Sequence, residues 1–364
     1  MRRKMIFSRN ILITVFACCA GFQVFSQPEN SSENLPKDYL TPAFHAGRRQ
    51  ALREMMPANS VTVIFSYPAQ VFSKDVDYVY HQNPDLYYFS GYKEPNSVLL
   101  IFKENQSDGD SSYNELFFVQ HRDVGAEQWT GKRLGVDGVK SLLGFKRVYN
   151  SETFGNFPID LKKFNIIYDA LQDTAVNLDS GSVHWLVNNF VKKAAIKPMD
   201  KNLAADLNTI YRNGNSKNLA RILTRMKPRL NSDAYKNDSL IQELIAKPDS
   251  ITLADIKKKY DAINTGTIAF NKYTNVLRGI KTPEELVLLK KSIEISSIAH
   301  TEAMKAVKPQ MSERQLEGIM LYVHKRYGAE DEGYPPIIGA GANGCILHYE
   351  ENNAVEVKNQ LVLM

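Results

Sequence analysis

Four short apolar runs, each rich in β-branched or aromatic residues, constrain most strongly what this chain can fold into. The runs are VTVIF (61–65), SVLLIF (97–102), ELFFVQ (115–120) and FNIIYDA (164–170). Runs of this length and composition are typical of buried strands. A helical stretch is expected at about residues 46–55, and helical or loop segments lie between the strands. The pattern predicts an α/β domain that ends near residue 185.

The next segment, residues 190–275, has a different character. Weak helical periodicity runs through AADLNTIYR, NLARILTRM and SLIQELIA, with Lys, Asn and Asp scattered among the apolar positions. We interpret this segment as a helical extension, a solvated packing layer to which we assign no chemistry.

Two capping patterns predict a pair of helices after residue 280. TPEE (282–285) combines a Thr N-cap, a Pro at the first helical position and a capping-box Glu. SERQ (312–315) repeats the capping pattern, and Gly328 is expected to close the second helix. The apolar residues of the first helix recur at i, i+3 and i+7, as Leu286, Leu289 and Ile293.

The segment YPPIIGAGANGCILHY (334–349) satisfies G-x-G-x-x-G, but its context argues against a dinucleotide site. A Rossmann fingerprint opens a helix, whereas CILHY (345–349) continues as an apolar run that we expect to be a strand. The glycines are better explained as a tight connection with positive φ angles. The chain also has no Walker loop, no H-E-x-x-H, no G-x-S-x-G and no paired C-x-x-C.

The N-terminus has the order of a secretory leader. Four basic residues precede the 15-residue run ILITVFACCAGFQVF (11–25), which is too short to span a bilayer comfortably. Val24 and Ser26 suit the −3 and −1 positions of signal peptidase, so we expect cleavage after Ser26 and export, to the periplasm or outside the cell. A lipoprotein leader would instead use Cys18 or Cys19. No later run is long and apolar enough to span a membrane.

Removing residues 1–26 lowers the net charge of the chain and changes which partners that charge favours. The segment holds four basic and no acidic residues, so the formal net charge falls from +5 to +1. A near-neutral chain without a basic-aromatic stripe is not expected to bind nucleic acid. Only Cys345 then remains, so no intrachain disulfide can form.

Four segments of the sequence carry a resemblance to a known family. DYVYHQNPDLYYFSGYKEPNSVLLIF (77–102) and FFVQHRDVGAEQWTGKRLGVDGV (117–139) resemble the N-terminal domain of Xaa-Pro aminopeptidases. RGIKTPEELVLLKKSIEISSIAHTEAM (278–304) resembles the entry to their catalytic domain, and GAGANGCILHYEENN (339–353) resembles the family's strand pair around an active-site histidine. The resemblance implies an N-terminal α/β domain of the creatinase/aminopeptidase P type and the opening part of a pita-bread metallopeptidase domain. We therefore expect four parts: a signal peptide (1–26), the N-terminal domain (40–189), a helical extension or linker (190–277) and an incomplete catalytic domain (278–364).

The resemblance also implies a function. Members of the family hold two divalent cations, commonly manganese, by two Asp, one His and two Glu, and release the residue before proline from proline-containing peptides. The first Asp ligand follows a strand that corresponds to LVLM (361–364), so we nominate no metal ligand here and expect an inactive, truncated chain that binds no metal specifically. A prolidase-like dipeptidase and a non-catalytic peptide-binding relative are the alternatives. A homo-oligomer is expected for the complete protein.

Two residues are candidate site residues by this resemblance. His348 corresponds to a histidine that faces the metals and hydrogen-bonds the substrate as a donor, not a ligand. Trp129, in EQWTGKRLG, resembles a loop that can approach a neighbouring subunit's active site and bind substrate. From the residues alone, His348 is by default a core residue, whereas surface packing explains Trp129 as well as substrate binding does. The acidic run 330–332 is more simply a solvated loop than a metal site.

Overall fold

The computed structural model describes residues 39–109, 111–171, 179–196, 200–213, 216–247 and 252–364. The expected signal peptide, residues 1–26, lies outside them. Leu40–Thr282 form one compact unit and Pro283–Met364 belong to another. The predicted four-part division stays a prediction.

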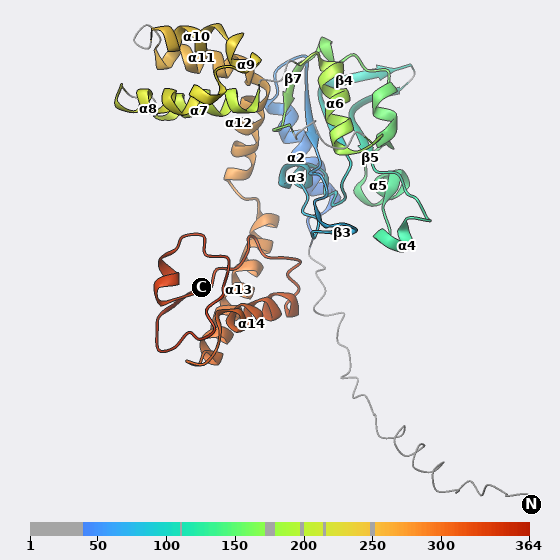
Figure 1. Ribbon diagram of the computed structural model, residues 1–364. Coiled ribbons are helices and arrows are strands. Elements are labelled where there is room, and N and C mark those ends of the chain that lie inside the picture. Colours follow the sequence, from blue (N-terminus) through green and yellow to red (C-terminus); the bar gives the residue numbers. More distant parts are fainter. Residues whose placement is uncertain (1–38, 110, 172–178, 197–199, 214–215, 248–251) are drawn as a thin grey trace, which may run out of the picture. The chain divides into compact units, whose positions relative to one another are not determined.

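The first unit is built on a five-stranded sheet of order β6-β5-β4-β1-β7 (Figure 1). The central strand β4 pairs antiparallel with β1 and β5, while β1–β7 and β5–β6 are parallel pairs. All four predicted strands are confirmed, and the short edge strand β6 is an addition. The strands are β1 (Ser60–Phe65), β4 (Val98–Asp108), β5 (Ser111–Val119), β6 (Val148–Asn150) and β7 (Asn165–Tyr168).

Both faces of this sheet are covered, which explains why the buried parts of β1, β4 and β5 are nearly unbroken apolar runs. Alternate residues face opposite sides: Val63 packs into one hydrophobic cluster and Ile64 into the other. Helix α6 (Val183–Ala194) covers the Val63 side, so the domain extends past the predicted end near residue 185. Helices α2 (Pro42–Met55), α3 (Pro84–Ser90) and α5 (Gly135–Leu143) contribute to the Ile64 side.

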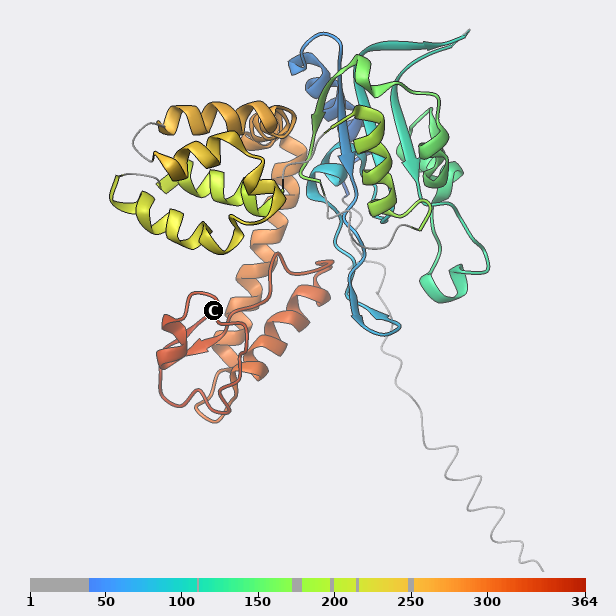
Figure 2. The same ribbon diagram turned by 45° about the horizontal axis from the view of Figure 1, so that its top comes forward.

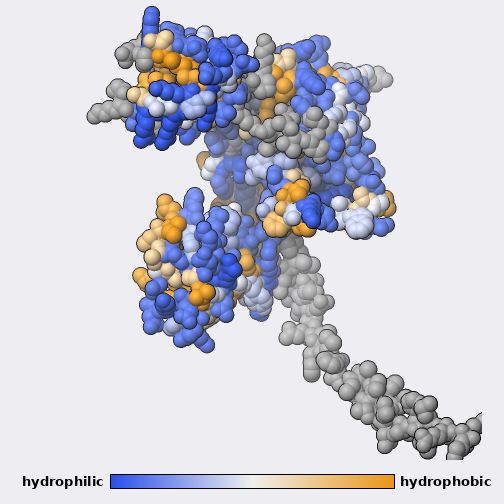
Figure 3. All heavy atoms as spheres, in the orientation of Figure 1, coloured by the Kyte–Doolittle hydropathy of each residue, from blue (hydrophilic) through white to orange (hydrophobic). Residues whose placement is uncertain are grey.

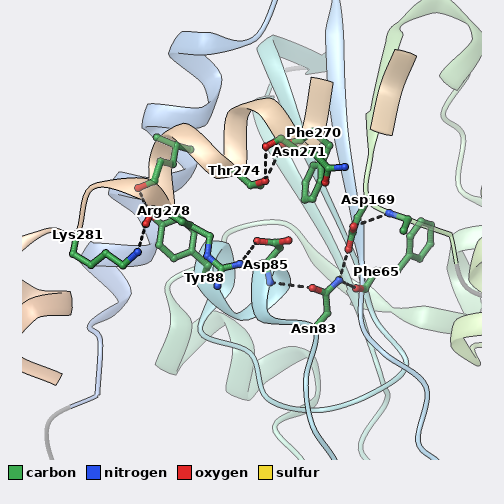
Figure 4. Close-up of polar contacts among 12 residues, drawn as sticks. Phe65, Asn83, Asp85, Tyr88, Asp169, Phe270, Asn271, Thr274, Arg278 and Lys281 are labelled. Carbon is green, nitrogen blue, oxygen red and sulfur yellow. Dashed lines mark hydrogen bonds and ion pairs between the residues drawn. The ribbon is translucent and has the colours of Figure 1, made fainter. Parts of the chain in front are cut away.

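Helix α12 (Thr265–Gly279) also covers the Ile64 side, although it falls within the predicted helical extension. Phe270 is completely buried there, and a Cβ on Gly266 would lie 2.5 Å from the Tyr168 ring. The end of α12 is tied to α3, because Arg278 Nη1 lies 2.6 Å from Asp85 Oδ1 and Tyr88 donates to the Leu277 carbonyl oxygen at 3.0 Å (Figure 4). The extension thus includes part of the core of the N-terminal domain.

Asn83, the N-cap of α3, ties that helix to two strand ends. Its side-chain amide donates to the Phe65 carbonyl oxygen at 2.8 Å and to Asp169 Oδ2 at 2.7 Å (Figure 4). Burial raises the pKa of Asp169 despite these bonds.

Five helices between α6 and α12 form a module with a hydrophobic cluster of its own (Figures 1 and 2). Leu207 and Ile210 of α7 meet Met226 of α8 and Ile256 of α11 in that cluster. The three predicted helical stretches are confirmed. The module comprises α7 (Lys201–Asn213), α8 (Ser216–Met226), α9 (Asp233–Lys236), α10 (Ser239–Ala246) and α11 (Leu253–Ile263).

The second unit contains the predicted helix pair, α13 (Pro283–Ala306) and α14 (Glu313–Arg326). The capping box of Ser312 and Gln315 is confirmed, and Gly328 has a φ of +86° just beyond α14. The buried side of α13 is formed by Ile295, Ala299 and Ala303, whereas the predicted apolar stripe is exposed to solvent. Apolar side chains accordingly appear on the surface of this unit (Figure 3).

Short elements complete the two units. In the first unit these are a hairpin of β2 (Val71–Ser73) and β3 (Val76–Asp77), helix α4 (Glu127–Thr130) and the 3₁₀ turns η1 (Ser151–Asn156), η2 (Leu161–Lys163) and η3 (Lys227–Arg229). In the second they are β8 (Gly339–Ala340), η4 (Gly341–Cys345) and β9 (Val362–Leu363), with β8 and β9 paired antiparallel.

Candidate active site

His348 lies in an exposed turn, not on a strand. The segment predicted to be a strand, 345–349, instead follows the 3₁₀ turn η4 and bends at residues 347–348. That prediction is wrong because the apolar run has no strand to pair with. In the described residues β8 pairs only with β9, and Leu347 of the run is 89% exposed. His348 therefore points from a surface loop, where an imidazole can meet a ligand.

The buried carboxylate of Glu313 accepts hydrogen bonds from several residues of the loop that carries His348. Glu313 is the first residue of α14 and is fully buried. Its Oε1 accepts from the Ala340 N–H at 2.8 Å and from Asn343 Nδ2 at 3.1 Å. Its Oε2 accepts from the Tyr349 hydroxyl at 2.7 Å and from the Ala354 N–H at 2.9 Å. Residues before and after His348 are thus bound to one side chain.

These donors also set the charge of Glu313. Burial alone would raise the pKa of Glu313, but the N–H groups of Ala340 and Ala354 and the Tyr349 hydroxyl outweigh it, so that the pKa lies below its usual value. Glu313 is therefore an ionised, fully hydrogen-bonded carboxylate.

Asn352 closes the base of the same loop. Its Oδ1 accepts from the Ile338 N–H and its Nδ2 donates to the Pro336 carbonyl oxygen, both at 2.9 Å. Asn352 is buried and has a φ of +45°, a conformation that Asn tolerates better than most residues.

The glycines of G-x-G-x-x-G serve the close packing of this loop. Gly341 has a φ of +55°, and a Cβ there would collide with the Gln360 side chain. A Cβ on Gly339 would lie only 2.7 Å from the Gly344 nitrogen. A tight connection is confirmed, although only the middle glycine has a positive φ.

Trp129, the second candidate, lies in α4 of the first unit and is 90% exposed. Glu127 shapes this segment: its carboxylate binds Arg122 Nε at 2.6 Å and accepts from the Arg133 N–H at 3.2 Å. No other part of the first unit, as far as it is described, covers the indole ring of Trp129. Trp129 and His348 belong to different units, so they are weighed separately.

Sequence reasoning named His348 as a candidate but did not name the residues that hold its loop, Glu313, Tyr349 and Asn352. Glu313 sits inside the recognised capping pattern SERQ, where it reads as an ordinary acidic residue of a first helical turn. Its partners are 27 to 41 residues away in the chain.

The described residues contain no group of three or more His, Cys, Asp or Glu side chains that could hold a metal ion. The acidic run 330–332 forms a surface loop in which Lys325 contacts Asp331 at 3.4 Å and His324 lies 3.8 Å from Glu332. Among the helices of the described ranges, none combines the length and apolarity needed to cross a membrane.

The chain matches two family models in order. The model described as aminopeptidase P, N-terminal domain, covers residues 45–164, and the model of metallopeptidase family M24 covers residues 287–364. The Xaa-Pro aminopeptidase of Escherichia coli K12 is 30% identical over 318 residues, which is 87% of this chain and 56% of that protein. The Xaa-Pro aminopeptidase of Haemophilus influenzae is 24% identical over 91% of this chain and 57% of its own length.

Solved structures agree with these relatives. Aminopeptidase P from E. coli in its low-pH form matches with a TM-score of 0.56 and 25% identity, covering 89% of this chain and 58% of that one. Proline aminopeptidase P II from Yersinia pestis gives a TM-score of 0.57 at 25% identity with the same coverage. The chain thus spans somewhat more than half the length of these proteins. The predicted fold class is confirmed, and the predicted resemblance to the aminopeptidase P family is confirmed by both family models and by these relatives.

Proposed function

We propose that this chain is part of a metal-dependent Xaa-Pro aminopeptidase, which releases an N-terminal residue that precedes proline. The observation that carries the proposal is the ordered match of both halves to aminopeptidase P, with 30% identity across 87% of the chain. A relative solved with the inhibitor Pro-Leu supports proline-containing peptides as the substrate class. Peptides of this kind need a dedicated enzyme because the X-Pro bond is a tertiary amide without an N–H.

We favour a pair of manganese ions for the proposed enzyme. The ligands that would bind them are not among the described residues. Divalent cations in such sites supply Lewis acidity and an activated water. The described residues do not fit a metal centre, so we assign them other tasks.

His348 is proposed to be a hydrogen-bond donor in the active site. An exposed imidazole on a loop that is bound on both sides to Glu313 can present an N–H to the substrate carbonyl oxygen, and hold it there as negative charge develops. A fixed donor of this kind loses no energy to reorientation during the reaction.

Trp129 is proposed to contact substrate in a homo-oligomer. An indole that is 90% exposed in its own unit offers a large apolar surface to a peptide or to a second copy of the chain. Export after cleavage of residues 1–26 is also part of the proposal.

The test is peptide hydrolysis by the enzyme expressed from its complete gene and supplied with manganese. We expect release of free alanine from Ala-Pro-Xaa, and a loss of kcat of about 10²–10³ in His348→Ala with metal content unchanged. His300→Ala is the matched control, because His300 lies in the same unit and its imidazole bonds its own helix at Ser296. Cleavage confined to the dipeptide Ala-Pro would contradict the aminopeptidase, and near-normal kcat in His348→Ala would remove His348 from the site.

A further inference from the structure

We propose that Glu313 is the positioning residue of the active-site loop: its carboxylate fixes residues 340–354, and through them the imidazole of His348. This inference rests on the proposed role of His348. Glu313 does not touch substrate in this scheme; it acts only through the loop.

Polar bonds, together with the buried ring of Tyr349, hold the segment around His348. The hydrophobic cluster of this unit takes Ala340 and Ile338 from one side of the loop and Val357 from the other, but in the described residues it contains nothing from 341–356. Ile346 and Leu347 are exposed and give the turn no apolar anchor. Fixing His348 therefore falls to hydrogen bonds made by its neighbours.

Glu313 supplies those bonds at four points of the loop. Its partners are Ala340 at the start, Asn343 in the turn, Tyr349 directly after His348, and Ala354 at the end. Asn343 Nδ2 also donates to the Tyr349 hydroxyl at 2.8 Å, which links the residues on both sides of the exposed turn.

The chemistry of the cluster requires an ionised carboxylate. All four partners donate, and a carboxylate offers about four acceptor sites and no proton. In Glu313→Gln, one carboxylate oxygen becomes an NH₂ group, which faces the two donors that this oxygen accepted in the parent. The backbone N–H of either Ala340 or Ala354 therefore loses its acceptor. Glutamine is nearly the same size, so the variant tests the charge and the acceptors without opening a cavity.

Glu313 is itself mounted rigidly. Its own N–H donates to the Ala354 carbonyl oxygen at 3.1 Å while its carboxylate accepts from the Ala354 N–H. It stands one residue after the capping-box Ser312, and the N-terminus of α14 favours a negative charge there. The helix thus gives the loop a fixed point.

The experiment is a double-mutant cycle between Glu313→Gln and His348→Ala in the metal-loaded enzyme, joined to hydrogen exchange of residues 339–354. Positioning predicts that Glu313→Gln lowers kcat at least about tenfold in the parent but less than about twofold when His348 is already alanine. It also predicts faster exchange in 339–354, with metal content unchanged. Glu317→Gln, one turn along the same helix and without a bond to the loop, should leave both measurements at parent values.

Equal losses of kcat in both backgrounds would overturn the proposal, because a general structural defect ignores whether His348 is present. Parent-like exchange in Glu313→Gln would overturn it too. If Glu313→Gln does not fold, Tyr349→Phe removes one of the four donors and should show the same dependence on His348 at smaller size. Normal kcat in His348→Ala would sink the proposed function of His348 even if exchange of the loop responds to Glu313, so the two failures are distinguishable.

Discussion

The imidazole of His45 lies against the α-carbon of Gly91: a Cβ on Gly91 would sit 2.9 Å from both Cδ2 and Nε2 of the ring. His45 is buried, and its Nδ1 donates to the Tyr88 carbonyl oxygen at 2.9 Å. Gly91 ends α3 with a φ of +73°, and its N–H donates to the Tyr87 carbonyl oxygen at 2.7 Å. This pair therefore joins α2 to the end of α3 with no room for a side chain at residue 91.

We predict that Gly91→Ala lowers the free energy of unfolding by about 2–5 kcal/mol, combining the cost of a left-handed alanine with overpacking against His45. Gly144→Ala is the matched control: Gly144 also ends a helix, with a φ of +76°, but a Cβ there meets nothing within 4 Å. It should cost only about 1–2 kcal/mol. Both tryptophans, Trp129 and Trp185, lie in the Leu40–Thr282 unit, so denaturation followed by tryptophan fluorescence reports on it. Equal losses would show that the His45 ring moves aside freely.

The same contact predicts a pH dependence of stability. Burial, and to a lesser extent the charge of Arg49, lower the pKa of His45 below its usual value of 6.5. Between these two pKa values the imidazole is protonated in the unfolded chain but neutral in the folded chain. The contribution of His45 to the free energy of unfolding is therefore complete above pH 6.5 and is lost as the pH falls toward the lowered pKa. Fluorescence-monitored denaturation from about pH 7.5 to about pH 5 should show this loss, and His45→Gln should flatten it. An unchanged slope in His45→Gln would contradict the assignment.

A polypeptide of residues 1–364 is predicted to bind no manganese pair and to release no alanine from Ala-Pro-Xaa. The described residues offer no group of three or more His, Cys, Asp or Glu side chains that could hold a metal ion. Calorimetric titration with manganese and product analysis by mass spectrometry check both statements. Stoichiometric binding or metal-dependent turnover would show that a metal site exists in this chain after all.

The exported protein is predicted to begin at Gln27. The basic and apolar order of residues 2–25 and the small Ser26 suit signal peptidase. Mass spectrometry of the protein isolated from its host gives the N-terminal residue directly. Retention of residues 1–26 would contradict export by cleavage, and a lipid on Cys18 or Cys19 would replace it by a lipoprotein route.

The sheet and most helices could be predicted because their signals are local. Strands buried on both faces appear as unbroken apolar runs, and caps such as Ser312 mark helix starts. The apolar run 345–349 resembles in sequence the runs that form strands. Whether such a run becomes a strand depends on a pairing partner elsewhere in the chain, which the run itself does not reveal. Glu313 illustrates the remainder: its role follows from donors that only the folded loop brings to it. The place of α12 in the sheet domain is set by contacts of Phe270 with residues far earlier in the chain.

The position of α12 also determines when the N-terminal domain can finish folding. One face of its sheet is covered in part by residues 265–279, so that face stays incompletely covered on the ribosome until about 100 residues after β7 have been synthesised. At roughly 5–20 residues per second, this leaves an apolar surface open for several seconds during translation. The helical module, which has its own core, can fold during that interval. The sheet face that Phe270 covers is therefore the apolar surface that a nascent chain of this protein leaves incompletely covered for longest.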